Sequence, residues 1–185
     1  MKRTFLAIKI PVSKKATEII NDIKFVLKDE KIKWVESWNL HVTLFFLGDT
    51  EEELIGEISQ SLSDKFKNTK SFILRYSGLG VFKNVYNPKT IWFGIEKSEN
   101  LQKLKSDINH AMNLVGFNVE AREFRPHLTI ARTKFLKDKN QLKELINKYC
   151  QLDIQDTEIK EIIFYESKLT AKGPIYKVLK SIPLN

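Results

Sequence analysis

The sequence contains very little cysteine and no long apolar segment. Its single cysteine, Cys150, excludes an internal disulfide and a cysteine-rich zinc site, and we expect it to be a small packing residue. The first apolar run, Phe5 to Ile8, stops at Lys9 and is too short for the core of a signal peptide. No stretch approaches the ~18 apolar residues of a membrane span. We therefore expect a soluble, cytoplasmic protein with no membrane partner.

Motifs for several other chemistries are also missing. There is no Gly-x-Ser-x-Gly elbow of a serine hydrolase and no His-x-x-x-His pair. Zinc needs three or four ligands, and the third histidine, His110, lies on a predicted helix where it faces solvent or the helix edge. The ligand set is therefore too small, and we expect no metal site.

The composition fits a folded domain that carries excess positive charge. The 185 residues are 42% hydrophobic and include 12 Phe, 5 Tyr and 3 Trp, which is enough for a core in one large domain or two small lobes. The formal charge is 31 − 23 = +8. Such a balance favours polyanionic partners, but the 23 acidic residues are well mixed among the basic ones. Charge alone therefore decides little.

Two short stretches repeat the pattern His, apolar, Thr, apolar. The first is His41-Val42-Thr43-Leu44 and the second is His127-Leu128-Thr129-Ile130. Residues i and i+2 of a strand point to the same face, so each histidine shares a face with its threonine. Two imidazoles and two hydroxyls in one cleft are suited to acid–base chemistry on a phosphate.

The surrounding pattern predicts an antiparallel α+β arrangement. We expect helices after Ser13, after a capping-box pattern at Thr50, after Ser98 with an end at Gly116, and from Asp138 or Asn140. Strands are expected at 4–10, 32–35, 40–47, 71–82, 91–95, 117–119, 124–131, 158–169 and 176–182. The two motif histidines are 127 − 41 = 86 residues apart, which suggests a duplicated lobe with one motif from each half.

A non-catalytic RNA-binding module is the alternative of a different class. It is supported by the net charge of +8 and by aromatic residues that could stack bases, namely Phe45, Phe46, Tyr86, Trp92 and Phe93. No glycine-rich RNP1-like stretch is present, however. A binding module also gives no reason for a duplicated His-x-Thr pattern, whereas a catalyst does.

The two motifs and their flanks resemble the 2H phosphoesterase superfamily. Within it the chain is similar to the RNA 2′,3′-cyclic phosphodiesterases, historically labelled 2′-5′ RNA ligases. The likeness covers essentially the whole chain, and it is carried by 3–8, 34–35, 39–48, 80–82 with Trp92, 126–132, 166–169 and 173–176.

The resemblance implies a single domain over residues 1–185 built of two packed lobes. Two antiparallel sheets, related by a pseudo-twofold and flanked by helices, would enclose an active-site groove. It also implies catalysis without a metal or a nucleotide cofactor. The expected partners are RNA 3′ ends or small nucleotides that carry a 2′,3′-cyclic phosphate, and we expect a monomer.

The resemblance assigns roles to individual residues. His41 is the general acid and His127 the general base, while Thr43, Thr129 and Arg132 hold the phosphate oxygens. Phe46 falls on the family's substrate-binding aromatic position after the first motif. Strict strand alternation places Phe46 opposite Thr43, in the core, unless a bulge intervenes.

The expected reaction is hydrolysis of RNA or nucleotide 2′,3′-cyclic phosphate ends to 2′-phosphomonoesters. Reversible 2′-5′ RNA ligation and non-catalytic RNA binding remain the alternatives.

Overall fold

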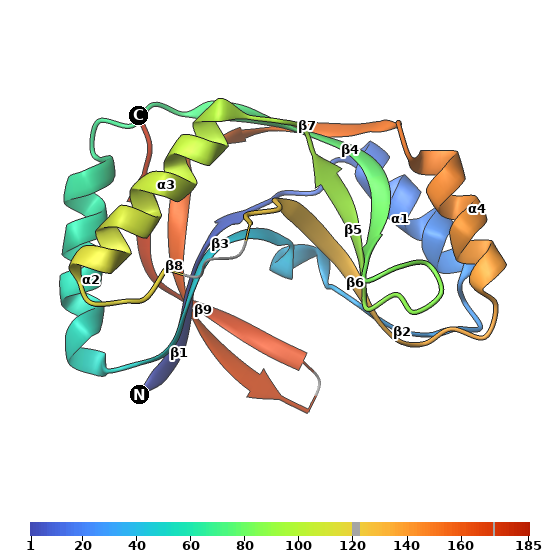
Figure 1. The fold of residues 1–185 in the computed structure, drawn as a ribbon, viewed down its shortest axis with the longest axis horizontal. Coiled ribbons are helices and arrows are strands. Elements are labelled where there is room, and N and C mark those ends of the chain that lie inside the picture. The colour runs from blue at the N-terminus through green and yellow to red at the C-terminus, as the bar shows by residue number, and fades with distance from the viewer. Residues whose placement is uncertain (120–122, 172) are drawn as a thin grey trace.

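The computed structural model describes residues 1–119, 123–171 and 173–185, and its strands form two antiparallel sheets (Figure 1). The first sheet has the order β3-β1-β8-β9, with bounds His41–Thr50, Lys2–Lys9, Glu161–Thr170 and Gly173–Pro183. The second has the order β2-β6-β5-β4-β7, with bounds Lys31–Trp34, His127–Phe135, Thr90–Ile95, Phe72–Phe82 and Asp153–Ile159.

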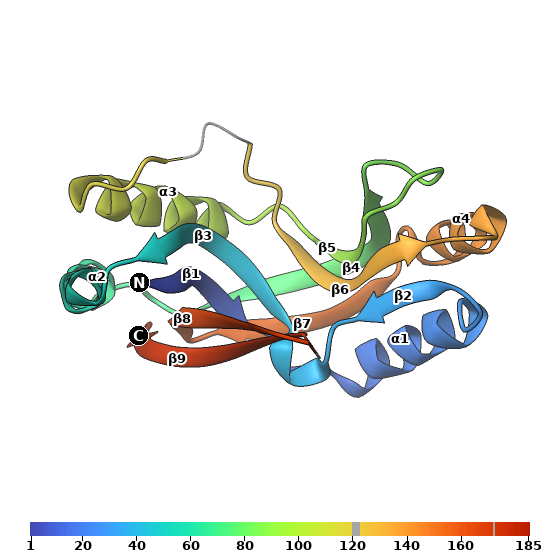
Figure 2. The same ribbon diagram turned by 90° about the horizontal axis from the view of Figure 1, so that it is seen from below.

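Helices cover the outer side of each sheet, which gives two lobes (Figures 1 and 2). The first lobe carries α2 (Glu52–Phe66) and α3 (Glu99–Leu114), and the second carries α1 (Lys14–Val26) and α4 (Lys139–Tyr149). A short 3₁₀ helix, Ser37–Asn39, precedes β3. The α+β architecture of two antiparallel sheets that was predicted from the sequence is therefore confirmed. Among the described helices, none has the length and apolarity that crossing a bilayer requires.

The lobes are not the two halves of the sequence. Each half does supply one His-Thr strand, but β8 pairs with β1, so both ends of the chain lie in the first sheet. The chain crosses between sheets several times, because β2, β4 and β5 belong to the second sheet while β3 returns to the first. The expectation that each half builds one lobe is wrong.

Most helix ends follow the predicted capping chemistry. The hydroxyls of Ser13 and Ser98 accept hydrogen bonds from the N–H groups of Ala16 and Leu101, and Gly116 ends α3 at φ +86°. The capping box at Thr50 is wrong. Thr50 is the last residue of β3, which does not end at Gly48 as expected, and its hydroxyl lies 2.7 Å from that of Thr4 on β1.

Three further expectations are corrected by the structure. Residues 117–119 are not a strand, and the single strand expected at 158–169 is two strands, β7 and β8, which belong to different sheets. Cys150 is exposed, and its thiol donates to the Asn147 carbonyl at 3.3 Å. Its position just after the last turn of α4 leaves it outside the packed face of that helix.

The main core joins the two lobes. Its buried side chains come from both sheets, for example Leu6 and Leu44 from the first and Phe93 and Leu128 from the second. The opposite face of the first sheet carries a smaller, separate cluster formed by Phe5, Ala7, Ile163, Tyr165 and, partly buried, Tyr176.

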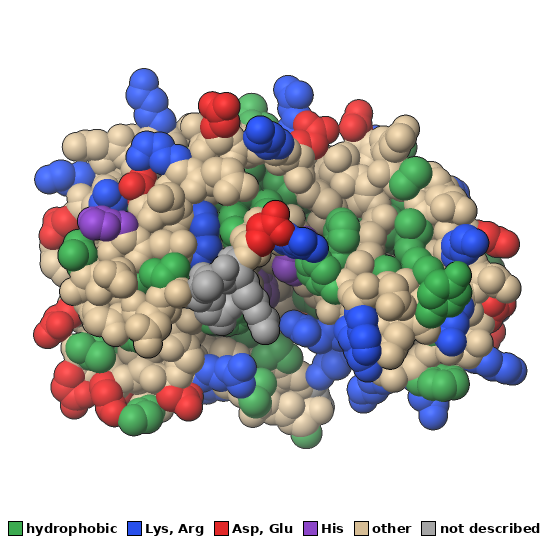
Figure 3. Space-filling view, viewed as in Figure 1, with side chains coloured by type: hydrophobic (Ala, Val, Ile, Leu, Met, Phe, Trp, Pro, Cys, Tyr) green, Lys and Arg blue, Asp and Glu red, His purple; other side chains and the backbone are tan. Residues whose placement is uncertain are grey.

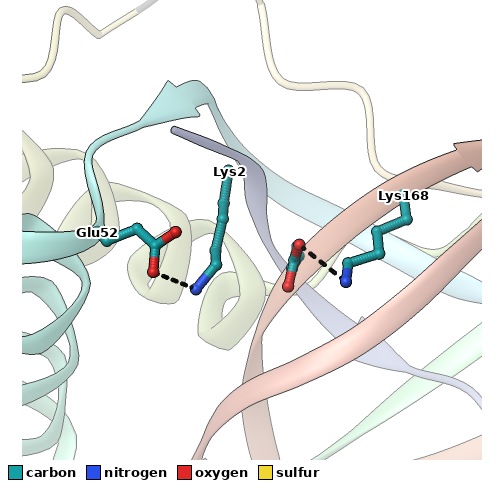
Figure 4. A network of polar contacts seen from close by, with 4 residues as sticks. Lys2, Glu52 and Lys168 are labelled. Carbon is teal, nitrogen blue, oxygen red and sulfur yellow. Dashed lines mark hydrogen bonds and ion pairs between the residues drawn. The ribbon is translucent and has the colours of Figure 1, made fainter.

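Charged side chains surround the beginning of β1 (Figure 4). The Lys2 ammonium lies 2.8 Å from the Glu52 carboxylate of α2, and Lys168 lies 3.6 Å from Glu166, which is only 6% exposed. The hydrogen bond to Glu52 raises the pKa of Lys2, and the negative charge of Glu166 acts in the same direction. The ion pair with Glu52 thereby ties the first strand to α2.

Candidate active site

The two His-Thr strands lie side by side where the lobes meet. β3 and β6 approach each other in both ribbon views, and each begins with its motif histidine (Figures 1 and 2). Figure 3 shows histidine side chains at the bottom of a central hollow with basic side chains at its rim. His41 and Thr43 on one strand, and His127 and Thr129 on the other, are all half-buried.

Both strands carry a β-bulge at the same place in the motif. Leu44 has no partner because Thr43 pairs with Ala7 and Phe45 pairs with Leu6. In β6 the corresponding residue is Ile130, which is skipped between the pairs Thr129–Trp92 and Ala131–Ile91. A bulge inserts one residue and reverses the alternation beyond it.

The bulges bring the fifth residue after each histidine onto the histidine face. In β3 this residue is Phe46, which is 65% exposed and whose ring centroid lies 6.1 Å from that of Phe5. In β6 it is Arg132, which is also exposed. The strict alternation that placed Phe46 in the core is therefore wrong, and the extra residue is the reason.

Backbone carbonyls hold both imidazoles in the same way. Nδ1 of His41 lies 2.6 Å from the carbonyl oxygen of Asn39, and Nδ1 of His127 lies 2.8 Å from that of Arg125. A carbonyl oxygen only accepts, so Nδ1 carries the hydrogen in each ring. Nε2 is then the nitrogen that can exchange a proton with a substrate. Asn39 is itself fixed, because its side chain donates to the Pro174 carbonyl at 3.2 Å.

The surroundings favour the neutral form of both histidines. Burial is the main cause that lowers the pKa of His41 and of His127, and the carbonyl hydrogen bonds oppose it. The positive charge of Arg132 lowers both pKa values further. Beyond the bulge, Arg132 lies on the same face of β6 as His127.

Aromatic rings pack around each histidine, and sequence reasoning assigned them no role at the site. The His41 ring lies 5.2 Å from Phe5 and 5.1 Å from Tyr176, the latter at 86°. The His127 ring meets Phe82 edge-on at 4.5 Å, and Phe82 contacts Trp92 at 5.3 Å. These edge-to-face contacts restrict the orientations of the imidazoles.

The absence of a side chain at Gly80 leaves space for the Trp92 ring, which supports His127 through Phe82. A Cβ atom built there would lie 2.2 Å from the Trp92 ring, so the indole occupies the space that any side chain would need. The indole Nε1 is buried and has no hydrogen-bond partner within the described structure. The Gly80-Val81-Phe82 stretch of the sequence was the one available signal for this support.

A pocket of about 210 Å³ opens beside His41. Its lining includes Lys9, Trp38, Tyr165 and Tyr176. Trp38 belongs to the 3₁₀ helix and is 67% exposed, which is unusual for an indole and which sequence reasoning did not single out. An aromatic-walled pocket next to an acid–base histidine can hold a planar ring such as a nucleobase.

Other residues considered from the sequence lie elsewhere. Phe45 and Phe93 are buried in the main core, so the idea that they stack bases is wrong. His110 is exposed on α3, as expected. Within the described part of the chain, no three His, Cys, Asp or Glu side chains are grouped as metal ligands would be.

Sequence comparison finds a matching family profile and several similar proteins. The 2′-5′ RNA ligase superfamily profile matches residues 11–168. A Methanocaldococcus jannaschii protein named RNA 2′,3′-cyclic phosphodiesterase is 41% identical over 179 residues, which cover 96% of this chain and 98% of the relative. A Thermotoga maritima protein of the same name is 38% identical over 181 residues, covering 96% and 92%.

Solved structures show the same fold. A protein of Thermus thermophilus superposes with a TM-score of 0.81 at 23% identity, over 98% of this chain and 97% of the other. Escherichia coli LigT complexed with 3′-AMP gives a TM-score of 0.74 at 22% identity, over 100% and 98%.

Proposed function

This chain belongs to the 2′-5′ RNA ligase superfamily, and we propose that it hydrolyses 2′,3′-cyclic phosphates at RNA or nucleotide ends to 2′-phosphomonoesters. Curated relatives that share up to 41% identity over nearly the whole chain carry the name RNA 2′,3′-cyclic phosphodiesterase. The observation that carries the proposal is the matched pair of histidines. Each has Nδ1 held by a carbonyl and Nε2 left for proton transfer, on two strands that meet between the lobes.

The reaction needs one proton taken up and one given back. Water attacks phosphorus as the P–O3′ bond breaks, and the two groups that handle protons must stand on opposite sides of phosphorus. Histidines contributed by different lobes meet this requirement. His127 Nε2 accepts the proton of the attacking water, and His41 Nε2–H donates a proton to the departing O3′.

Charge that develops on the phosphate needs donors close at hand. Arg132 lies on the histidine face of β6, and its guanidinium can bind two phosphate oxygens at once. Thr43 and Thr129 share the histidine face of their strands, where their hydroxyls can donate to the nonbridging oxygens. These three side chains bind the phosphate, while the histidines move protons.

The aromatic residues set the direction in which a nucleotide lies. Phe46 and the pocket formed by Trp38, Tyr165 and Tyr176 all belong to the His41 side, whereas Arg132 belongs to the His127 strand. With the base against the aromatic surfaces and the phosphate at Arg132, the two ribose oxygens are not equivalent. O3′ is the oxygen presented to His41.

The test is the identity of the product. Incubation with a nucleoside 2′,3′-cyclic phosphate, followed by chromatography against standards, should give the 2′-nucleotide. A dominant 3′-nucleotide would mean that the substrate lies the other way round and would exchange the roles of His41 and His127. Absence of any turnover would leave RNA binding without catalysis.

A further inference from the structure

A second pocket, of about 290 Å³, lies on the second lobe beyond Arg132. We call it the distal pocket. Its lining residues come from the β4–β5 loop, the end of β6 and the start of α4, and the five that matter here are Tyr86, Lys89, Lys134, Phe135 and Lys139.

The loop that forms one wall is held in place by hydrogen bonds. The Asn84 side chain accepts from the N–H groups of Tyr86 at 3.0 Å and of Asn87 at 2.9 Å. Thr133 of β6 is bonded to the same loop twice, because its hydroxyl donates to the Pro88 carbonyl and its N–H donates to the Lys89 carbonyl at 3.1 Å. The pocket is therefore built before any ligand arrives.

Its electrostatic character is positive. Lys89, Lys134 and Lys139 are exposed, and none has a carboxylate within 4.0 Å among the described residues. The acidic side chains of this region are engaged by the backbone instead. Glu30 accepts from the N–H groups of Lys137 and Asp138, and Asp138 caps α4. An anionic ligand therefore meets these three ammonium groups.

Two large aromatic side chains stand among these lysines. Tyr86 is 71% exposed and Phe135 is 61% exposed. Exposed aromatic rings interleaved with basic residues form the surface that binds single-stranded nucleic acid, because bases stack on the rings while lysines contact the phosphates. A protein partner of acidic character would use the lysines but would have less need for flat rings.

The distal pocket adjoins the part of β6 that carries Arg132. Lys134, which lines it, lies two residues beyond Arg132 and therefore shares its face of β6. Lys33 of β2 stands opposite Arg132 in the sheet, and such like-charged neighbours repel unless an anion lies between them. At about 3.3 Å per residue, β6 spans roughly 25 Å from His127 to Phe135. Figure 3 shows basic side chains along this lower edge of the second lobe.

We propose that the distal pocket binds the RNA chain upstream of the terminal cyclic phosphate, so that the enzyme acts on single-stranded RNA ends in preference to mononucleotides. The proposal rests on the proposed function, since it concerns the path that the upstream part of a bound RNA substrate follows away from the two histidines. The 3′-terminal nucleotide sits at the two histidines. Phosphates of the preceding nucleotides follow Arg132 and Lys134, and a base stacks on Tyr86 or Phe135.

The experiment compares two substrates. One is a mononucleoside 2′,3′-cyclic phosphate and the other is a single-stranded RNA of six nucleotides with the same end. Each is assayed with the wild-type protein, with Lys134→Gln/Lys139→Gln and with Tyr86→Ala/Phe135→Ala. Matched controls are Lys97→Gln, an exposed lysine beyond the opposite end of β5, and Phe25→Ala, an exposed aromatic on α1.

The wild-type protein should show a higher kcat/KM for the hexanucleotide. Both double variants should lower that value by at least about fivefold, the lower end of the effect of losing one stacked base. The mononucleotide should be unaffected within about twofold, and neither control should change either substrate. The log–log salt dependence of hexanucleotide kcat/KM should become shallower by about 0.7 for each lysine removed.

Each contrary outcome has a distinct meaning. Equal kcat/KM for the two substrates would overturn the proposal and leave the proposed function intact. A strong hexanucleotide preference that both double variants retain would also overturn it, and would place the upstream RNA across the aromatic pocket of Tyr165 and Tyr176. Hydrolysis of neither substrate would overturn the proposed function and this proposal with it.

Discussion

Neighbouring groups hold both histidine rings in a defined tautomer and orientation. A backbone carbonyl two residues earlier in the chain fixes the tautomer of each imidazole, at 2.6 Å for His41 and 2.8 Å for His127. Ring contacts with Tyr176 on one side and Phe82 on the other restrict their rotation. Neither the carbonyl hydrogen bond nor the ring contact requires a charged partner for the histidine, so both rings can be neutral near pH 7.

We expect His41→Ala and His127→Ala each to lower kcat for a nucleoside 2′,3′-cyclic phosphate by at least ~10², the scale of general acid–base catalysis. Circular dichroism should show that both variants stay folded. His110→Ala is the matched control, because this exposed histidine on α3 lies outside the site and should have normal activity. Near-normal turnover by either site variant would remove that histidine from the mechanism.

The pH dependence follows from the lowered pKa values. Burial and Arg132 shift the pKa of both histidines below the usual value of 6.5, so both are mostly neutral at pH 7. Catalysis needs one protonated and one neutral ring, a state that is most populated between the two pKa values. The kcat/KM profile should therefore be bell-shaped with its maximum below pH 6.5. The kcat profile should lie at higher pH, because a bound phosphate anion favours imidazolium.

Substitution of Arg132 tests the same electrostatics independently. In Arg132→Gln the positive charge that disfavours imidazolium is gone, so both histidine pKa values rise and the alkaline limb of kcat/KM moves to higher pH. The maximum rate should also fall, because phosphate binding is weakened. Lys97→Gln should leave the profile in place. An Arg132→Gln profile with an unmoved alkaline limb would contradict the effect of the Arg132 charge on the histidine pKa values.

At the level of elements, the paired bulges in β3 and β6 determine which side chains face the groove. Leu44 and Ile130 occupy the same position in their motifs, and each shifts the register of its strand by one residue. As a result Phe46 and Arg132 face the groove together with the histidines. The residues at this shared position differ, and under the proposed function Phe46 contacts the nucleotide while Arg132 binds its phosphate.

Replacement of glycine by alanine should change the free energy of unfolding in opposite directions at Gly80 of β4 and Gly56 of α2. Gly80→Ala places a Cβ about where the Trp92 ring lies, so it should lower the free energy of unfolding by about 1–3 kcal/mol. Gly56→Ala adds a Cβ with nothing within 4 Å on α2 and should raise it by about 0.5–1 kcal/mol. Urea denaturation would measure both.

Activity distinguishes the two glycine variants further. Displacement of Trp92 also moves Phe82, which holds the His127 ring edge-on, so Gly80→Ala should reduce kcat in protein that is still folded. Gly56→Ala should have normal kcat. Equal stability of the Gly80 variant and the wild type would show that the indole can move aside without cost.

At the level of the whole molecule, the two lobes share one main core. Because β8 returns to pair with β1, the first sheet cannot form until the last part of the chain is in place. Buried residues of both sheets belong to the same cluster. This arrangement couples the lobes and fixes the distance between the two histidine strands.

We therefore expect the lobes to unfold together. Trp34 and Trp92 lie in the second sheet and Trp38 in the link to β3, so tryptophan fluorescence reports mainly on the second lobe. Far-UV circular dichroism reports on both lobes. The two urea transitions should coincide, as expected for a single cooperative unit. Separate midpoints would show that the lobes are independent domains.

The sequence by itself determined much of the secondary structure and predicted the chemistry. His-x-Thr repeated in two apolar strand patterns predicted the acid–base pair, and local signals such as Ser13, Ser98 and Gly116 placed helix ends correctly. These features depend on residues within a few positions of one another. Strand periodicity and capping are local properties of a chain, so a sequence reveals them without knowledge of its distant contacts.

Only the tertiary structure decided which face Phe46 occupies, where the lobes divide and what surrounds the histidines. The bulge at Leu44 exists because β1 pairs with β3 in a particular register, and no residue of β3 alone records that pairing. Tyr176 and Phe5 meet His41 although 135 and 36 residues separate them from it (176 − 41 and 41 − 5). Such contacts arise from packing between distant segments, which a local pattern does not encode.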